Sequence, residues 1–179
     1  MPQSAARDGE NMLNAEKLYL PTDAERIKSL RVGTFVSIDG TLYTARDQAH
    51  KRIAAAISAG EKPPFALDSA AIYYCGPTPA TDGNVIGSCG PTTSGRMDAY
   101  TPLLLSHGLK VMIGKGVRNE QVTHAIKQNG AVYLTAIGGA AALYQSRVVA
   151  CELVAYPDLG CEAVYKLTVK DFPAVVSVM

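Results

Sequence analysis

Charged side chains are scarce in this sequence. Of its 179 residues, 18% are charged and 47% are hydrophobic, whereas charged residues make up about a quarter of a typical soluble domain. The 17 basic and 16 acidic residues leave a formal net charge of +1. Neither nucleic acid nor a membrane is therefore expected as a partner, because neither would meet a broad basic face. The composition also excludes a disordered chain, and it leaves a polar surface that is thin for a free monomer.

Cysteine is also sparse, and its spacing excludes common metal sites. No C-x-x-C pair occurs, and the spacing suits neither a zinc ribbon nor a standard iron–sulfur cradle. No apolar run approaches the ~18 residues of a membrane span, and no secretory signal is visible, so we expect a cytoplasmic protein. In that compartment we expect the four cysteines to be free, buried thiols: Cys75, Cys89, Cys151 and Cys161. We therefore expect this chain to hold no metal.

Self-contained catalytic and nucleotide-binding motifs are missing as well. The glycines of 83–90 do not form G-x-G-x-x-G, and the Gly-Lys pair at 114–115 is followed by glycine instead of the Ser or Thr of a P-loop. No G-x-S-x-G elbow occurs, and no cysteine has a local base. Surface or half-buried positions on helices, without carboxylate partners, are expected for the histidines, His50, His107 and His124.

The length of the chain predicts one domain with an arm, since domains usually run ~100–200 residues. Residues 1–21 lack clear periodicity, so we interpret them as an N-terminal arm that could pack on a partner, followed by a domain over 22–179. A capping box from Thr22 to Glu25 predicts a helix through about Leu30. The Asp-Gly pair at 39–40 lies between alternating runs and predicts a β-hairpin over 33–44.

Strand and helix patterns then alternate through the domain. Apolar residues at helical spacing, each run ending near a stop signal, predict helices over 46–59, 96–106, 119–128 and 140–148. Short apolar or alternating runs predict strands over 70–75, 110–113, 131–135 and 164–169. This order indicates an α/β fold with a mostly parallel central sheet.

Positive side chains recur where the predicted strands lead into helices. The junctions 44–47, 90–96 and 114–118 carry Arg46, Arg96 and Lys115. A cation at a helix start is unfavourable by roughly a few tenths of a kcal/mol, unless an anion lies against the same helix end. Ligands of open α/β sheets gather at this edge, beyond the carboxyl ends of the strands. The repeated pattern therefore indicates an anion site.

The junction 90–96 offers the most hydrogen-bond donors. Its hydroxyls at Thr92, Thr93 and Ser94 stand beside free helix-start N–H groups, and Arg96 could grip a carboxylate with two parallel bonds. The pattern leaves two alternatives open, a simple helix cap for the hydroxyls and a turn decoration for Lys115. Solvated surface charges are expected for Arg52, Arg118 and Arg147.

Four ordered motifs carry a family resemblance. The run 86–98 (IGSCGPTTSGRMD) resembles the signature of the iron–sulfur hydro-lyase β region, and 40–52, which contains TARDQAH, is similar to its second motif. The runs 76–79 (GPTP) and 112–116 (MIGKG) match two more, so the resemblance spans roughly residue 20 to the C-terminus. That region forms the C-terminal half of class I fumarases and the β subunit of two-subunit fumarases and tartrate dehydratases.

The resemblance implies a swivelling β/β/α domain that packs on a separate α subunit. In the family, three cysteines of the α part hold a four-iron (4Fe-4S) cluster, and none of the cysteines here is an expected ligand. By carry-over, Arg46, Arg96 and Lys115 bind the substrate carboxylates. The resemblance also assigns Thr92 as the base that removes the proton beside a carboxylate, with Thr93 as the alternative.

The resulting hypothesis is a β subunit of a fumarate hydratase, which interconverts fumarate and malate and is active only with its α partner. L-tartrate dehydratase is the alternative within the same class, because its substrate differs by one hydroxyl. A non-catalytic subunit that binds dicarboxylate, or has a structural role, is the alternative from another class. A homodimer or heterotetramer is the expected assembly.

Overall fold

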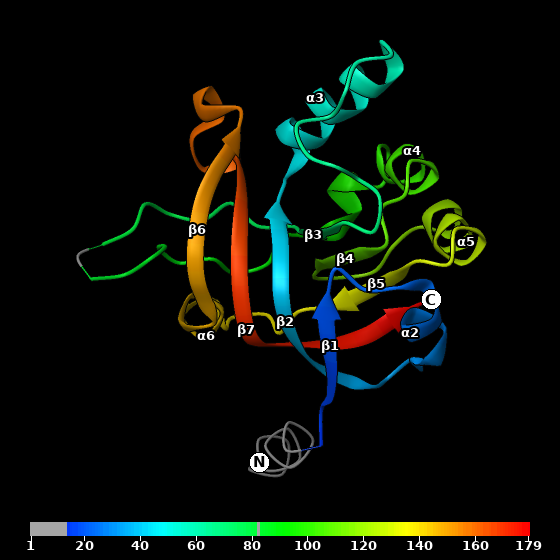
Figure 1. Cartoon of the computed structure of the whole chain (residues 1–179), viewed down its shortest axis with the longest axis horizontal. Helices are drawn as coiled ribbons and strands as arrows, with labels where there is room; N and C mark the ends of the chain where they lie inside the picture. The colour runs from blue at the N-terminus through cyan, green and yellow to red at the C-terminus, as the bar shows by residue number, and fades with distance from the viewer. Residues whose placement is uncertain (1–13, 82) are drawn as a thin grey trace.

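A computed structural model describes residues 14–81 and 83–179, and its strands form one mixed sheet (Figure 1). Seven strands of the described residues lie in the order β1-β2-β3-β4-β5-β7-β6. Their bounds are β1 (Glu16–Leu20), β2 (Phe35–Thr44), β3 (Ala71–Tyr73), β4 (Val111–Gly114), β5 (Val132–Thr135), β6 (Val148–Ala155) and β7 (Val164–Val178). The α/β class predicted from the alternating pattern is therefore present.

The sheet closes on itself, which the sequence did not predict. Strands β1 to β5 pair in parallel with their neighbours, in chain order. The long strand β7 then pairs antiparallel with β5, β6 and β2, so β2-β3-β4-β5-β7 form a five-stranded barrel. The result is a mixed barrel with β1 and β6 as additional strands, in which the pairings of β7 are antiparallel and the others are parallel.

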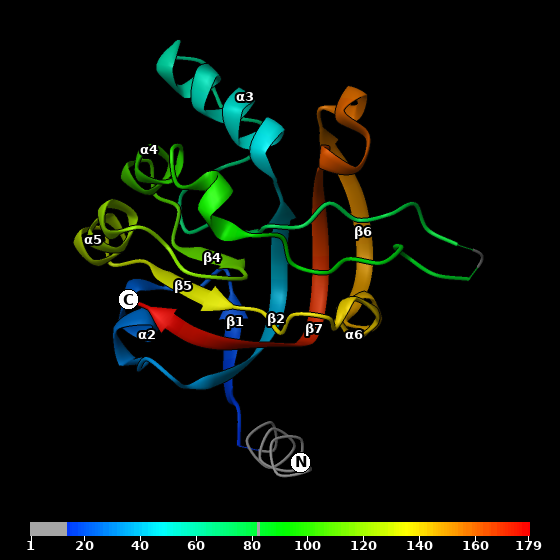
Figure 2. The same ribbon diagram turned by 180° about the vertical axis from the view of Figure 1, so that it is seen from behind.

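Alternation along the barrel strands creates two cores. Successive side chains of a strand point to opposite faces, so Tyr73 faces the barrel interior while Ile72 and Tyr74 face outward. The interior core also takes in α2 (Ala24–Ser29) and α6 (Ala141–Ser146). The outer core lies between β3–β5 and the helices α3 (Asp47–Ser58), α4 (Thr101–Ser106) and α5 (Glu120–Gln128), which lie along one side of the barrel (Figure 2).

The start of the chain contributes a strand. Glu16–Leu20, within the predicted arm, pairs in parallel with residues 36–40 of β2. Residues 1–13 of that arm lie outside the described residues. The predicted helix that follows is α2, but its N-cap is Asp23 instead of Thr22, and the Asp23 carboxylate accepts the Arg26 amide at 2.7 Å.

The predicted hairpin at Asp39-Gly40 is wrong. Residues 35–44 form one continuous strand, and Gly40 marks a bulge in its pairing with β7. Gly40 has φ +120°, and a Cβ there would lie 2.1 Å from the carbonyl oxygen of Leu20. Glycine is therefore required here for close packing of β1 on β2, a reason that a local turn pattern does not reveal.

The predicted helix over 96–106 is split in two. A short 3-10 turn, η1 (Ser94–Met97), precedes α4, and Pro102 lies in the first turn of α4. Proline has no amide to donate, so a helix that continued through it would lose a backbone hydrogen bond. The Thr101 hydroxyl donates to the Met97 carbonyl at 2.8 Å and stabilises the break.

The loop between β3 and η1 folds back on itself. Thr78 anchors it, because its carbonyl accepts the Gly87 amide at 3.1 Å and its hydroxyl accepts the Ser88 amide at 2.8 Å. The two limbs run beside each other and project past β6 in both views (Figures 1 and 2). The turn η2 (Pro157–Glu162) joins the end of β6 to the start of β7.

Replacing Gly40 with alanine tests the packing of β1 on β2. We expect the Gly40→Ala variant to lose about 3 kcal/mol or more of unfolding free energy, because both strain and a backbone clash oppose the new methyl group. Gly33→Ala is the matched control, since Gly33 has φ +89° with nothing within 4 Å of a built Cβ. That control should lose only about 1 kcal/mol in urea titrations. Equal losses would contradict the close approach of the two strands.

Candidate active site

The predicted site residues lie at the carboxyl ends of neighbouring parallel strands. Arg46 is two residues beyond β2 and forms the N-cap of α3, while Lys115 directly follows β4. Thr92 reaches the same edge from the long loop, because its amide donates to the carbonyl of Tyr74, just beyond β3, at 2.7 Å. Parallel pairing of β2, β3 and β4 brings these ends to one edge of the barrel.

Backbone hydrogen bonds join residues 92–94, here called the threonine segment, directly to Lys115. The Lys115 amide donates to the Thr92 carbonyl at 3.2 Å, and the Ser94 amide donates to the Lys115 carbonyl at 2.9 Å. Thr93 and Lys115 thus form an isolated parallel bridge beyond the end of β4. The structure therefore brings together two of the junctions singled out in the sequence.

Gly114 permits this close approach. A Cβ at position 114 would lie 2.1 Å from the Ser94 hydroxyl oxygen and 2.7 Å from Cδ2 of the Tyr74 ring. Ser94 is fully buried, and its hydroxyl bonds to the Tyr133 hydroxyl at 2.8 Å. The glycine of the G-K-G run is therefore needed for packing inside the site.

Arg96 and Lys115 carry exposed charges. Arg96 lies in η1, and its amide donates to the Thr93 carbonyl at 3.4 Å. In residues 14–81 and 83–179, neither Arg96 nor Lys115 has a carboxylate within ion-pair distance. Their positive charge is therefore available to an anion from outside the chain.

Arg46 is half-buried and only loosely paired. Its Nε lies 3.7 Å from Glu162 Oε1 and 4.0 Å from Asp47 Oδ1, and it has no hydrogen-bond partner among the described residues. A Cβ at Gly76 would lie 2.9 Å from Cδ of Arg46 and 3.0 Å from its Nη1. The arginine stem therefore packs on bare backbone at the end of β3, and its guanidinium retains unused donors.

His50 lies in the interior, not on the surface or half-buried as predicted. Its Nδ1 lies 2.9 Å from the carbonyl oxygen of Arg46, which can only accept, so Nδ1 carries the proton. The ring packs edge-on against Tyr74, with 5.3 Å between centroids. Burial lowers the pKa of His50 to about 4, and the nearby Arg118 charge acts in the same direction. A neutral imidazole that anchors the main chain of Arg46 follows from this arrangement.

Arg118 is also buried, which contradicts the prediction of a solvated charge. Its Nε donates to Asp98 Oδ1 at 2.7 Å. Arg52 does lie at the surface, where it pairs with Asp158, and Arg147 is half-buried. The Asp98–Arg118 pair joins residues 20 positions apart, so no helical spacing could have revealed it.

The cysteines do not gather at the site. Cys75 and Cys89 are buried, Cys151 is half-buried and Cys161 is exposed, so the prediction of buried thiols holds for two of the four. A hydrogen bond with the Cys89 thiol, together with burial, raises the pKa of Cys75. No group of three His, Cys, Asp or Glu side chains in the described part of the chain is placed to hold a metal. These residues therefore do not fit a cluster of their own.

This edge offers positive charge of the kind that pairs with a small anion carrying more than one carboxylate. It combines the guanidinium groups of Arg46 and Arg96, the ammonium of Lys115 and the hydroxyl of Thr92. Charge-assisted hydrogen bonds of this kind contribute roughly 1.5–3 kcal/mol each.

None of the helices in residues 14–81 and 83–179 has the length and apolar character that a membrane span requires.

Known proteins resemble the chain along its whole length. It is 41% identical to the anaerobic class I fumarate hydratase of Escherichia coli over 182 aligned residues, covering 99% of the chain and 33% of that protein. It is 44% identical to fumarate hydratase 2 of Leishmania major, covering 86% of the chain and 28% of that protein. The chain thus spans about a third of the fumarate hydratases that it matches.

A shorter relative has nearly the same extent as this chain. It is the Methanocaldococcus jannaschii protein named "Putative L(+)-tartrate dehydratase subunit beta", which is 37% identical over 86% of the chain and 81% of its own length. The family described as "Fumarase C-terminus" matches residues 1–179. The chain belongs to the Fumarase C-terminus family.

Proposed function

We propose that this chain is the β subunit of a class I fumarate hydratase, a hydro-lyase that interconverts fumarate and malate in the cytoplasm together with an α partner. The observation that carries the proposal is the gathering of Arg46, Thr92 and Lys115 at one edge of the barrel, with Arg96 one 3-10 turn away. Several relatives are named fumarate hydratases, which supports fumarate as the substrate.

The cations act on the carboxylates of the substrate. Removing a C–H proton beside an ionised carboxylate creates an aci-carboxylate with additional negative charge. Fixed cations aimed at that charge lower the barrier more than they stabilise the ground state. Arg96 and Lys115 are exposed and without carboxylate partners in the described residues, so their charge is free for this task.

Thr92 is the proposed base. Thr92 is half-buried, and its carbonyl accepts the Lys115 amide, whereas Thr93 is exposed. A threonine hydroxyl is a poor base unless a positive environment lowers its pKa or an acid from the partner relays the proton. The half-buried position of Thr92 favours it as the base, and Thr93, which pairs with Lys115 in the isolated bridge, is the alternative.

The α partner is proposed to cover this edge. Val117, two residues beyond Lys115, is 87% exposed, and Ile137 beyond β5 is 38% exposed. A partner seated on this edge would cover both of these apolar side chains. We propose that this partner holds the 4Fe-4S cluster and that the present chain is a swivelling domain packed on the partner. The proposed assembly is a homodimer or a heterotetramer.

L-tartrate dehydratase is the second candidate. The match to the protein named as a tartrate dehydratase β subunit supports it, because the alignment covers 81% of that protein. The two substrates differ by one hydroxyl, which the described residues do not distinguish. Rates on fumarate and on tartrate, measured with the same complex, decide between them.

Replacing Thr92 tests the assignment of the base. We expect Thr92→Ala, produced anaerobically with the α partner, to lower kcat for fumarate hydration by about 100-fold or more, the usual effect of losing a general base. Thr93→Ala is the matched control and should stay within about threefold. Near-normal turnover of Thr92→Ala would favour the alternative of a non-catalytic subunit, and a reversed order would assign the base to Thr93.

Replacing Arg96 with lysine tests carboxylate binding. A single ammonium cannot imitate a planar fork that makes two parallel bonds, so we expect kcat/KM to fall by about 10- to 100-fold. Arg52→Lys provides the control, since Arg52 pairs with Asp158 on the surface and should leave the rate unchanged. Full activity of Arg96→Lys would argue against a bidentate carboxylate contact.

The isolated chain should bind no cluster. Two of its four cysteines are buried, one is half-buried and one is exposed, and no three His, Cys, Asp or Glu side chains of the described residues could hold a metal, so anaerobic reconstitution of the purified chain should yield no iron above background. Iron and sulfide analysis with absorption spectra measures this. A cluster formed on the chain alone would reverse the assignment of the cofactor to the partner.

A further inference from the structure

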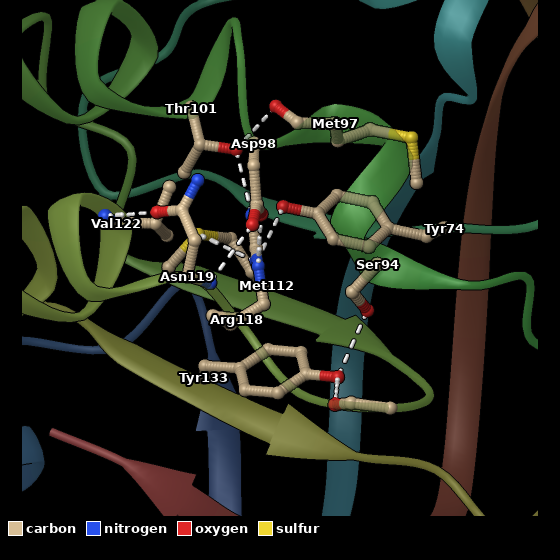
Figure 3. Close-up of polar contacts among 11 residues, drawn as sticks. Tyr74, Ser94, Met97, Asp98, Thr101, Met112, Arg118, Asn119, Val122 and Tyr133 are labelled. Carbon is tan, nitrogen blue, oxygen red and sulfur yellow. Dashed lines mark hydrogen bonds and ion pairs between the residues drawn. The ribbon is translucent and has the colours of Figure 1, made fainter.

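A buried guanidinium lies behind the candidate site. The side chain of Arg118 is fully buried, and each of its nitrogens has a partner (Figure 3). Nε donates to Asp98 Oδ1 at 2.7 Å, Nη2 to the Thr101 hydroxyl at 2.8 Å, and Nη1 to the Tyr74 hydroxyl at 3.1 Å. Arg118 is therefore held through all three nitrogens, and its full burial keeps it away from a substrate.

Two aromatic rings flank the same guanidinium. Its central carbon lies 5.3 Å from the ring centroid of Tyr74 and 5.0 Å from that of Tyr133. The Tyr133 hydroxyl donates to the Gly116 carbonyl at 2.7 Å, so it must accept the hydrogen of the Ser94 hydroxyl at 2.8 Å. The ring that packs on the cation thus joins the threonine segment to the loop after Lys115.

The partners of Arg118 hold the backbone that carries the site. Asp98 caps the end of η1, which contains Arg96, and its second carboxylate oxygen accepts the Asn119 amide at 2.9 Å. Tyr74 accepts the Thr92 amide through its carbonyl. The cluster of Arg118, Asp98, Tyr74 and Tyr133 therefore links the segments 92–98 and 115–119 from behind.

Stability alone does not account for this cluster. Removing a charge from water costs several kcal/mol, and well-packed apolar side chains often replace a buried ion pair without loss of stability. An arginine fork differs from apolar residues in fixing directions, because its donors lie in one plane. Directional control matters at a site where a misplacement of about 1 Å can cost about 100-fold in rate.

We propose that Arg118, Asp98 and Tyr133 are positioning residues, which hold Thr92, Arg96 and Lys115 in their reactive arrangement without touching the substrate. The inference rests on the proposed function for its chemistry. Its geometric part concerns only how firmly 92–98 and 115–119 are held, and that part is measurable without any activity.

The mildest test is Tyr133→Phe, which keeps the ring and removes the hydroxyl that joins Ser94 to Gly116. We expect kcat for fumarate hydration by the complex to fall about 10-fold, with a smaller change in KM, as for an interaction needed mainly in the transition state. Tyr144→Phe is the matched control, because the buried Tyr144 hydroxyl also bridges two groups, the Ile137 amide and the Pro173 carbonyl. That control should keep its kcat.

The ion pair is tested by replacing both partners. The double variant Arg118→Met, Asp98→Leu leaves no buried charge unpaired, so its Tm should stay within a few degrees of wild type. Its kcat/KM should nevertheless fall about 100-fold. The exposed pair provides the control, since Arg52→Met with Asp158→Leu should leave the rate unchanged. Wild-type rates in the buried double variant would overturn the proposal in favour of a merely structural pair.

Hydrogen exchange separates this proposal from the proposed function. In the full chain, amides of 92–98 and 115–119 should exchange faster in Tyr133→Phe than in wild type, and at wild-type rates in Tyr144→Phe. Unchanged exchange together with full activity of Tyr133→Phe would overturn the positioning role. A wild-type complex that neither hydrates fumarate nor dehydrates tartrate would instead overturn the proposed function. The exchange rates would still test how firmly 92–98 and 115–119 are held.

Discussion

The pairing of β7 with both β2 and β5 is the constraint on which the rest of the structure depends. It closes β2-β3-β4-β5-β7 into a barrel, and closure fixes the curvature and the order of the parallel strands. The interior fills with one set of alternating side chains, and the outer set packs against α3, α4 and α5. The carboxyl ends of β2, β3 and β4 therefore meet at one edge, where Arg46, Thr92 and Lys115 lie.

The parts of the fold that the sequence predicted are those with strong local patterns. Helices α3 and α5 and strands β3, β4 and β5 lie within a few residues of their predicted bounds, because their apolar spacing leaves little choice. Closure was not predictable, because it depends on contacts between residues more than a hundred positions apart, such as Val36 with Ala174. The same long-range pairing overrode the hairpin signal at Asp39-Gly40. The break before α4 was different, since Pro102 marked it in the sequence.

The positions of the candidate site residues at strand ends could be predicted from the sequence, but their supports could not. Arg118 has the same appearance in the sequence as a surface arginine, and only its distant partners Asp98 and Tyr74 make burial possible. His50 likewise stands on a helix with no sign of a partner, yet its ring lies in the outer core. The number of charged residues does not indicate the charge of this edge, because the buried charges of Arg118 and Asp98 neutralise each other. The exposed cations Arg96 and Lys115 therefore determine its electrostatic potential.

The backbone of Thr92 has a consequence for motion. Its amide and its carbonyl are both engaged, one with Tyr74 and the other with Lys115, so the residue is held like a member of a sheet. A side chain on such a support can rotate, but its Cα cannot shift without breaking two hydrogen bonds at once. The Cα of Thr92 is therefore fixed, and its hydroxyl can move only by rotation about the Cα–Cβ bond. In a shared site, the opening and closing that admit a substrate would fall to the tips of long side chains and to the opposing protein.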